Sequence, residues 1–253
     1  MRFGASLDLR FDESVGEFVE FLVDLGLDHV ELRQGYLDVH PAPPTPRELR
    51  ELAAARGLTY TFHAPYRDAN VGNLNEPLRR TIVAGVKRTL DMAFAAGAGA
   101  VVVHGGSVLR RYPERVRTYA RQQAVRSLRE CARHADDIGM ALCVENQRRR
   151  SARARYTETP AQLAAFLDEI DVDSEYLGVA VDVGHAKATG IGIDAFVERF
   201  GDRIHVAHLH DNDGTADQHA VLPEFRSVAA RIGAEYNVLE MKSLGDIARC
   251  VEG

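Results

Sequence analysis

The chain has 253 residues, a formal net charge of −6 and three cysteines, and 45% of its residues are hydrophobic. This length and composition suit one large core, and the acidic balance gives no general attraction to nucleic acid or to an anionic membrane. Cys131, Cys143 and Cys250 are scattered without a Cys-x-x-Cys pair, which argues against a disulfide framework and against thiolate metal ligation.

Eight short apolar runs recur along the chain. Each run has the length and composition of a buried β-strand. The predicted strands are Phe3–Leu7, His29–Leu32, Thr59–His63, Ala100–His104, Ala141–Glu145, Gly178–Asp182, Ile204–His208 and Asn237–Glu240.

Longer stretches with helical patterns separate these runs. Apolar residues recur at helical spacing, for example within residues 15–23. Thr45 followed by Pro46, and Thr159 followed by Pro160, are typical helix starts, and glycines such as Gly97 mark helix ends.

Strand–helix alternation with nearly continuous apolar strands predicts a parallel sheet covered by helices. Eight units in about 250 residues favour a closed (β/α)8 TIM barrel over an open sheet. No Gly-x-Gly-x-x-Gly follows the first strand, which weakens a dinucleotide-binding interpretation. No linker or low-complexity segment marks a boundary, so we expect a single domain over residues 1–253.

Histidines and carboxylates gather at the ends of the predicted strands and in the loops that follow them. In a barrel these ends meet on one face, where barrel enzymes carry out their chemistry. Imidazole and carboxylate ligands without thiolate suit Mn²⁺, Zn²⁺, Co²⁺, Fe²⁺ or Mg²⁺, and a cation would offset repulsion among the carboxylates. Any one of these residues alone could equally be structural, but their recurrence predicts a divalent-metal site. The set is His63, His104, Glu145, Asp182, His185, His208, Asp217, His219 and Glu240.

Three other histidines do not share this position. His29, His134 and His205 are interpreted as surface groups or as core groups with satisfied hydrogen bonds, without a functional role.

Several motifs resemble the xylose-isomerase-like TIM-barrel superfamily, and the resemblance covers nearly the whole chain. They are His63-Ala64-Pro65-Tyr66, Val144-Glu145-Asn146, Asp182-Val183-Gly184-His185, His208-Leu209-His210-Asp211-Asn212 and the terminal Glu240. The superfamily contains sugar and sugar-phosphate isomerases and epimerases, inosose dehydratases and, as a separate branch, endonuclease IV.

The epimerase branch implies one metal held by Glu145, Asp182, His208 and Glu240. Glu145 and Glu240 would then flank the substrate as the acid–base pair, exchanging a proton beside a carbonyl while the metal stabilises the enediolate.

The same resemblance implies a substrate-binding wall. His185 matches a position that touches substrate oxygens, while His63 and His104 would hold further metal or line the site. Glu31 and Arg33 could bind hydroxyls, or instead form an ion pair that closes the barrel mouth.

The endonuclease IV branch implies a different use of the site. All nine positions would hold three zinc ions for cutting abasic-site DNA, and each has a suitable residue here. The negative net charge and the short chain count against this alternative. A metal-binding barrel without activity is a third possibility.

Two loops leave the identity of the substrate undetermined. Residues 147–155 contain five arginines that could bind a phosphate, on a sugar or on a nucleic-acid backbone, or could form a solvated lid paired with acidic neighbours. The segment Asp211–Phe225 lacks the Gly-x-Gly that many superfamily members place after Asp-x-His.

The expected protein is a cytoplasmic isomerase or epimerase of a small carbohydrate. Its N-terminus lacks a signal-peptide pattern, and no stretch reaches the roughly 20 apolar residues of a membrane span. The sequence leaves open whether the protein forms a homo-oligomer.

Overall fold

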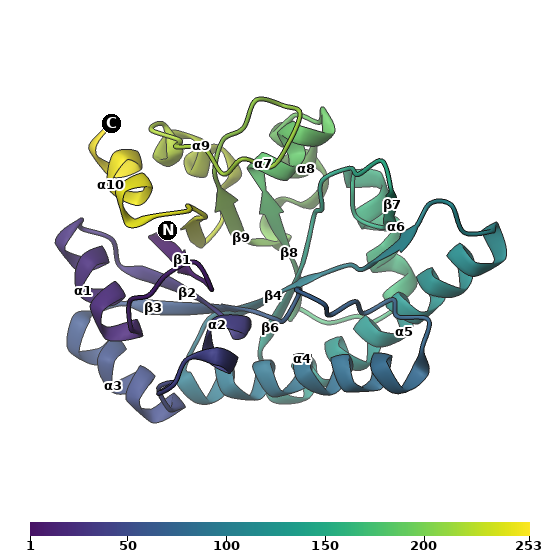
Figure 1. Ribbon diagram of the computed structural model, residues 1–253, viewed down its shortest axis with the longest axis horizontal. Coiled ribbons are helices and arrows are strands. Elements are labelled where there is room, and N and C mark those ends of the chain that lie inside the picture. Colours follow the sequence, from purple (N-terminus) through teal and green to yellow (C-terminus); the bar gives the residue numbers. More distant parts are fainter.

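The eight predicted runs form strands, each ending within one residue of its predicted bounds. In the computed structural model, which describes residues 1–253, they close into a parallel barrel in the order β1-β10-β9-β8-β6-β4-β3-β2 (Figure 1). The (β/α)8 barrel prediction is therefore confirmed. Its strands are β1 (Arg2–Leu7), β2 (His29–Arg33), β3 (Thr59–His63), β4 (Ala100–His104), β6 (Ala141–Glu145), β8 (Leu177–Asp182), β9 (Ile204–Leu209) and β10 (Tyr236–Leu239).

Helices cover the outside of the barrel. The two longest, α4 and α5, pack against each other along one side (Figure 1). No helix is both long enough and apolar enough to cross a membrane. The helices are α1 (Val15–Asp24), α2 (Gln34–Val39), α3 (Pro46–Arg56), α4 (Glu76–Ala96), α5 (Glu114–Ile138), α6 (Pro160–Ile170), α7 (Val183–Thr189), α8 (Ile193–Phe200), α9 (Phe225–Ile232) and α10 (Leu244–Glu252), with a 3-10 turn at Gly201–Arg203.

The predicted helix ends have the local chemistry that their sequences indicate. Thr45 caps α3 by accepting a hydrogen bond from the Glu48 amide, and Thr159 caps α6 in the same way. Gly97 ends α4 in the left-handed conformation, which glycine adopts without steric cost.

A small second sheet lies outside the predicted elements. Strands β5 (Ser107–Leu109) and β7 (Arg153–Arg155) pair antiparallel beside the barrel mouth. The arginine-rich segment is therefore partly a strand and not only a loop.

Alternation along the barrel strands decides which side chains face the axis. Ala100, Val102, Cys143, Ala180, Val206, Tyr236 and Val238 form a separate small core of seven buried residues. Since side chains two positions apart share a face, the same inward rows continue to His104, Glu145, Asp182, His208 and Glu240 at the strand ends. The fold thus gathers these polar groups on top of an apolar plug.

Candidate metal centre and active site

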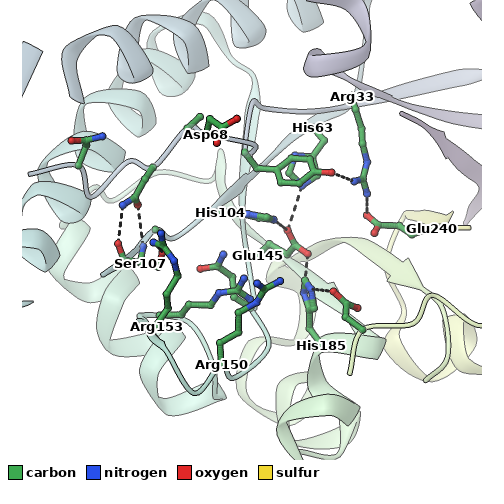
Figure 2. Close-up of a pocket in the computed structure, with 18 of the residues that line it drawn as sticks. Arg33, His63, Asp68, His104, Ser107, Glu145, Arg150, Arg153, His185 and Glu240 are labelled. Atoms are coloured by element: carbon green, nitrogen blue, oxygen red, sulfur yellow. Dashed lines mark hydrogen bonds and ion pairs between the residues drawn. The ribbon is translucent and has the colours of Figure 1, made fainter. Parts of the chain in front are cut away.

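A cavity of about 540 Å³ opens at the carboxyl ends of the strands. This volume lies in the range of small-molecule sites. Its walls are almost entirely polar, with only two hydrophobic residues among the 19 that line it. Figure 2 shows histidines around Glu145 on the floor, with Arg33 and Glu240 on one side and Arg150 and Arg153 on the other.

Glu145, the last residue of β6, is the centre of the cluster. Its Oε2 lies 2.8 Å from His104 Nε2 and 3.4 Å from His63 Nε2. Its Oε1 lies 3.2 Å from His185 Nδ1 and 3.4 Å from His208 Nδ1. One carboxylate therefore joins histidines from four different βα units.

Asp182 and His210 form a second part of the same cluster. Both are fully buried, and His210 Nε2 lies 3.1 Å from Asp182 Oδ1. Asp182, His210 and Glu240 each offer a ligand atom within 4.8 Å of the others. Asn146 fixes Asp182 by donating to its carbonyl and accepting from its amide, at 3.0 and 2.6 Å.

His208 has a different set of neighbours. Its Nε2 lies 2.9 Å from Glu31, and its Nδ1 lies 3.1 Å from Glu240. No hydrogen bond or ion pair joins the side chains of His208 and Asp182, although the resemblance implies that both share one metal. Glu31 is fully buried and does not line the cavity, and the same is true of His208, Asp182 and His210.

His210 is a site residue that the sequence analysis does not include. It follows β9 and lies two residues beyond His208, so alternation turns both side chains inward and places His210 nearer the mouth. That spacing is the signal available in His208-Leu209-His210. His208 lies against Glu145 and Glu240, and His210 shares a donor group with Asp182 and Glu240, so either histidine is a candidate for the fourth ligand of the metal.

Arg33 contributes the main cation on the opposite wall. It forms an ion pair with Glu240, and its Nη1 donates to Tyr66 Oη at 2.8 Å (Figure 2). Glu31 and Asp8 lie further away, at 3.9 and 3.6 Å. Arg33 still lines the cavity, so it can both hold Glu240 and contact a bound molecule.

The loop after β9 returns two more predicted ligands to the mouth. Asp211 and Ala220 exchange two backbone hydrogen bonds, which closes the loop without the missing glycines. Asp217 then reaches within 3.4 Å of His185 Nε2, and the ring of His219 stacks on His210 with centroids 4.1 Å apart. His219 has a φ of 52°, a conformation that costs energy in a non-glycine residue and is often found at functional sites.

Burial and charge act against each other in this cluster. Desolvation alone would raise the pKa of Glu145, but His104, His185 and His208 hold that pKa well below its ordinary value. Desolvation also disfavours charge on Glu240, whose pKa Arg33 and His208 nevertheless hold well below the ordinary value. Burial would lower the pKa of His185, yet Asp182, Asp217 and Glu145 raise it well above the ordinary value. The carboxylates thus need a compensating positive charge close by.

The donor set fits a divalent cation as the source of that charge. Asp217 Oδ1 is a buried oxygen without a hydrogen bond, and Glu145 Oε2 lies between the Nε2 atoms of His104 and His63. His63 Nδ1 lies 2.8 Å from the Ala64 carbonyl, which assigns the proton to Nδ1 and leaves the Nε2 lone pair facing Glu145. Oxygen and imidazole donors of this kind bind zinc, manganese or cobalt.

Comparison with known proteins identifies the family. The model of the family described as "Xylose isomerase-like TIM barrel" matches residues 19–242. The chain belongs to this family.

Three relatives show how wide the family is. An uncharacterized protein of Methanocaldococcus jannaschii is 30% identical over 234 residues, covering 88% of this chain and 75% of its own length. A probable endonuclease 4 of Mycobacterium leprae is 30% identical over 215 residues, covering 82% of this chain and 78% of its own. The crystal structure of a D-tagatose 3-epimerase-like protein has a TM-score of 0.83 and 27% identity, covering 100% of this chain and 95% of that one.

Family membership leaves both predicted reactions open. The family's relatives include epimerase-like proteins and a probable endonuclease, so the site has to distinguish between them. The remaining histidines do not contribute. His29 is buried and bonded to Thr59 and Thr61, while His134 pairs with Asp91 at the surface.

Proposed function

We propose that the protein is a divalent-metal-dependent isomerase or epimerase of a small polyhydroxylated carbonyl compound. The observation that carries the proposal is the placement of Glu145 and Glu240. Both carboxylates lie within 3.4 Å of the same nitrogen, His208 Nδ1, but come from β6 and from the end of β10. Two carboxylates that reach one floor from different sides can serve the two faces of one substrate carbon.

Glu145 and Glu240 would carry out the two halves of the proton transfer. One carboxylate takes the proton from the carbon beside the carbonyl, and the protonated form of the other returns a proton to the adjacent or opposite position. The low pKa values of Glu145 and Glu240 mean that both start as carboxylates, so the returning residue first takes its proton from solvent water, and the residue that removed the substrate proton afterwards releases it to solvent. Arg33 holds the orientation of Glu240 and contributes a fixed positive charge.

The metal would be held by Glu145, Asp182, His210 and Glu240. When bound, it would polarise the carbonyl and lower the pKa of the neighbouring carbon. His63, His104, His185, Asp217 and His219 surround this set, either as ligands of a further ion or as contacts for substrate oxygens. The epimerase-like relative supports the sugar chemistry of the proposal.

Hydrolysis of a phosphodiester is the second candidate. It is favoured by two further donor groups, His63–His104–Glu145 and His210–Asp217–His219, each with ligand atoms within 4.8 Å of one another. These groups provide room for more than one ion. The net charge of −6 argues against a DNA substrate. Metal analysis separates the candidates, since three zinc ions per chain would favour the hydrolase.

Deuterium exchange tests the proposal and does not require the product to be identified. Metal-loaded protein is incubated in D₂O with a panel of ketoses and aldoses, free and phosphorylated, and solvent deuterium beside the carbonyl is followed by NMR. Glu145→Gln and Glu240→Gln should each slow exchange by about 10²- to 10⁴-fold, the range for a lost general acid or base. Glu169→Gln, an exposed residue paired with Arg121, is the matched control and should not change the rate. No exchange on any sugar, together with cleavage of an abasic-site duplex, would refute the proposal.

A further inference from the structure

The arginines of residues 147–155 divide into two groups. Arg148 pairs with Asp217 at 3.4 Å, and Arg149 pairs with Glu158 at 3.5 Å. No ion pair of the structure involves Arg150, Arg153 or Arg155, and all three line the cavity. The alternative of a lid paired with acidic neighbours therefore applies only to Arg148 and Arg149.

The small sheet explains why the second group faces the cavity. Arg153 and Arg155 are two residues apart on β7, so they lie on one face, while Ala154 between them is paired with the buried Val108. Arg153 Nη1 also donates to Ser107 Oγ at 3.0 Å. The side chain of Asn70 in turn holds Ser107 (Figure 2). It accepts from the backbone N–H of Ser107 at 3.0 Å and donates to the backbone C=O of Ser107 at 2.8 Å. The arginines are thus mounted on a fixed element and not on a free loop.

Their charge is only partly compensated within the chain, by Asp217 and Glu145 acting without direct contact. Burial, followed by the nearby Arg150 and Arg148, lowers the pKa of Arg155 to about 10. Arg155 Nε is a buried donor without a hydrogen-bond partner. Of the four carboxylates on the cavity wall, Glu145, Asp217 and Glu240 contact histidines or other arginines, and none of the four forms an ion pair with Arg150, Arg153 or Arg155.

We infer that Arg150, Arg153 and Arg155 form an anion subsite that binds the phosphate group of a phosphorylated sugar. The inference rests on the proposed function and specifies its substrate class. Guanidinium groups bind phosphate oxygens through paired, charge-assisted hydrogen bonds, and a dianion would offset the mutual repulsion of three cations. The subsite and the Glu145 cluster share one cavity of about 540 Å³, which suits a small molecule that reaches both and is small for a DNA duplex.

Calorimetric titration with inorganic phosphate tests the subsite directly. Arg153→Met and Arg155→Met should each weaken phosphate binding by about tenfold, the effect of one lost charge-assisted hydrogen-bonding group. Arg149→Met, on the same segment but paired with Glu158 outside the cavity, should bind phosphate as the unaltered protein does. Equal phosphate binding in all of these proteins would place the phosphate elsewhere and overturn the inference. Arg153 is exposed, so its variant keeps the test valid if Arg155→Met fails to fold.

Substrate pairs test the assignment to a sugar phosphate. For each ketose, the phosphorylated form should exchange deuterium with a KM at least about tenfold lower than the free sugar, and Arg155→Met should remove that difference. Equal KM values for both forms would overturn the inference while the proposed function stands. Absence of exchange with every sugar would refute the proposed function, whereas the phosphate titration would still report on the subsite. Tighter binding of an abasic-site duplex than of any sugar phosphate, lost in Arg155→Met, would assign the subsite to nucleic acid and overturn the inference.

Discussion

His210 and His208 differ in what lies against each ring. His210 contacts Asp182 and stacks on His219, which lines the cavity, whereas His208 contacts Glu31, Glu145 and Glu240. A residue that orients ligands affects metal binding less than a ligand itself does. The two histidines therefore have distinguishable roles, although both are fully buried.

Substitution of each histidine separates these roles. His210→Ala should weaken zinc or manganese binding by more than about 100-fold, because a direct ligand is lost, while His208→Asn should weaken it by about 10-fold as an orienting group. His208→Asn should also destabilise the protein by about 3 kcal/mol, since Glu31 loses its buried partner. Competition titration with a metal chelator and urea unfolding measure the two effects. A larger loss of metal affinity in His208→Asn would restore the ligand set with His208.

His29 gives a pH-dependent contribution to stability that is independent of the metal. Burial lowers the pKa of His29 to about 4, whereas its pKa in the unfolded chain is about 6.5. Between these pH values the unfolded chain binds a proton that the folded state does not bind. Its contribution is complete above pH 6.5 and is lost as the pH falls from 6.5 to 4, by about 3 kcal/mol in total.

Urea unfolding between pH 4 and 7 checks this sign. The free energy of unfolding of the His29→Gln variant should fall less steeply with acidification than that of the unaltered protein. His134→Gln is the control, because His134 is only paired at the surface with Asp91. If the free energy of unfolding falls equally steeply with acidification in His29→Gln and in the unaltered protein, the lowered pKa of His29 is contradicted.

At the scale of elements, the amino-acid pattern determines most of what the barrel shows. Capping residues and glycines place the helix ends, and apolar runs place the strands, because both signals are local. The polar strand ends predict a shared site because the closed barrel itself brings them together. The sequence therefore predicts the cavity floor more completely than its walls.

The walls depend on contacts between distant segments. Strand β7 is three residues long, and its pairing with β5 joins residues more than 40 positions apart, so no local pattern in an arginine-rich segment indicates it. The bridge between Asp211 and Ala220 likewise closes a loop that lacks the Gly-x-Gly of many superfamily members. Glu31 is buried and does not line the wall, and its contact with substrate hydroxyls stays a prediction, because strand position alone does not say which layer of a barrel a side chain occupies.

Gly184 in α7 packs against the ring of His210, which follows β9. A Cβ at this position would lie 1.9 Å from the His210 ring, so Gly184→Ala should displace His210 and weaken metal binding by about tenfold or more. Gly85→Ala in α4 is a matched control, since its Cβ would meet only the flexible end of Arg88. That control should stabilise the protein by about 0.5–1 kcal/mol, as alanine does inside a helix. Unchanged metal affinity in Gly184→Ala would show that His210 is not a ligand.

At the scale of the whole molecule, the barrel closes only if β10 pairs with β1, and the predicted metal joins side chains from β6, β8, β9 and β10. Metal bound only by the folded state stabilises it by about 2.7 kcal/mol at a concentration 100 times Kd. For a domain of this size the Tm should rise by about 5–10 °C. Scanning calorimetry with and without chelator measures the shift, and His210→Ala should show little of it. An identical Tm in both conditions would mean that metal does not link these strands.

The central claim is that side chains from four separate βα units hold one cation at the barrel mouth. Crystals loaded with zinc test it through anomalous scattering recorded across the zinc edge. We predict a peak in contact with Glu145, Asp182, His210 and Glu240, at the roughly 2.0–2.2 Å typical of nitrogen and carboxylate ligands of zinc. A loaded crystal with no ion touching these four residues would contradict the claim.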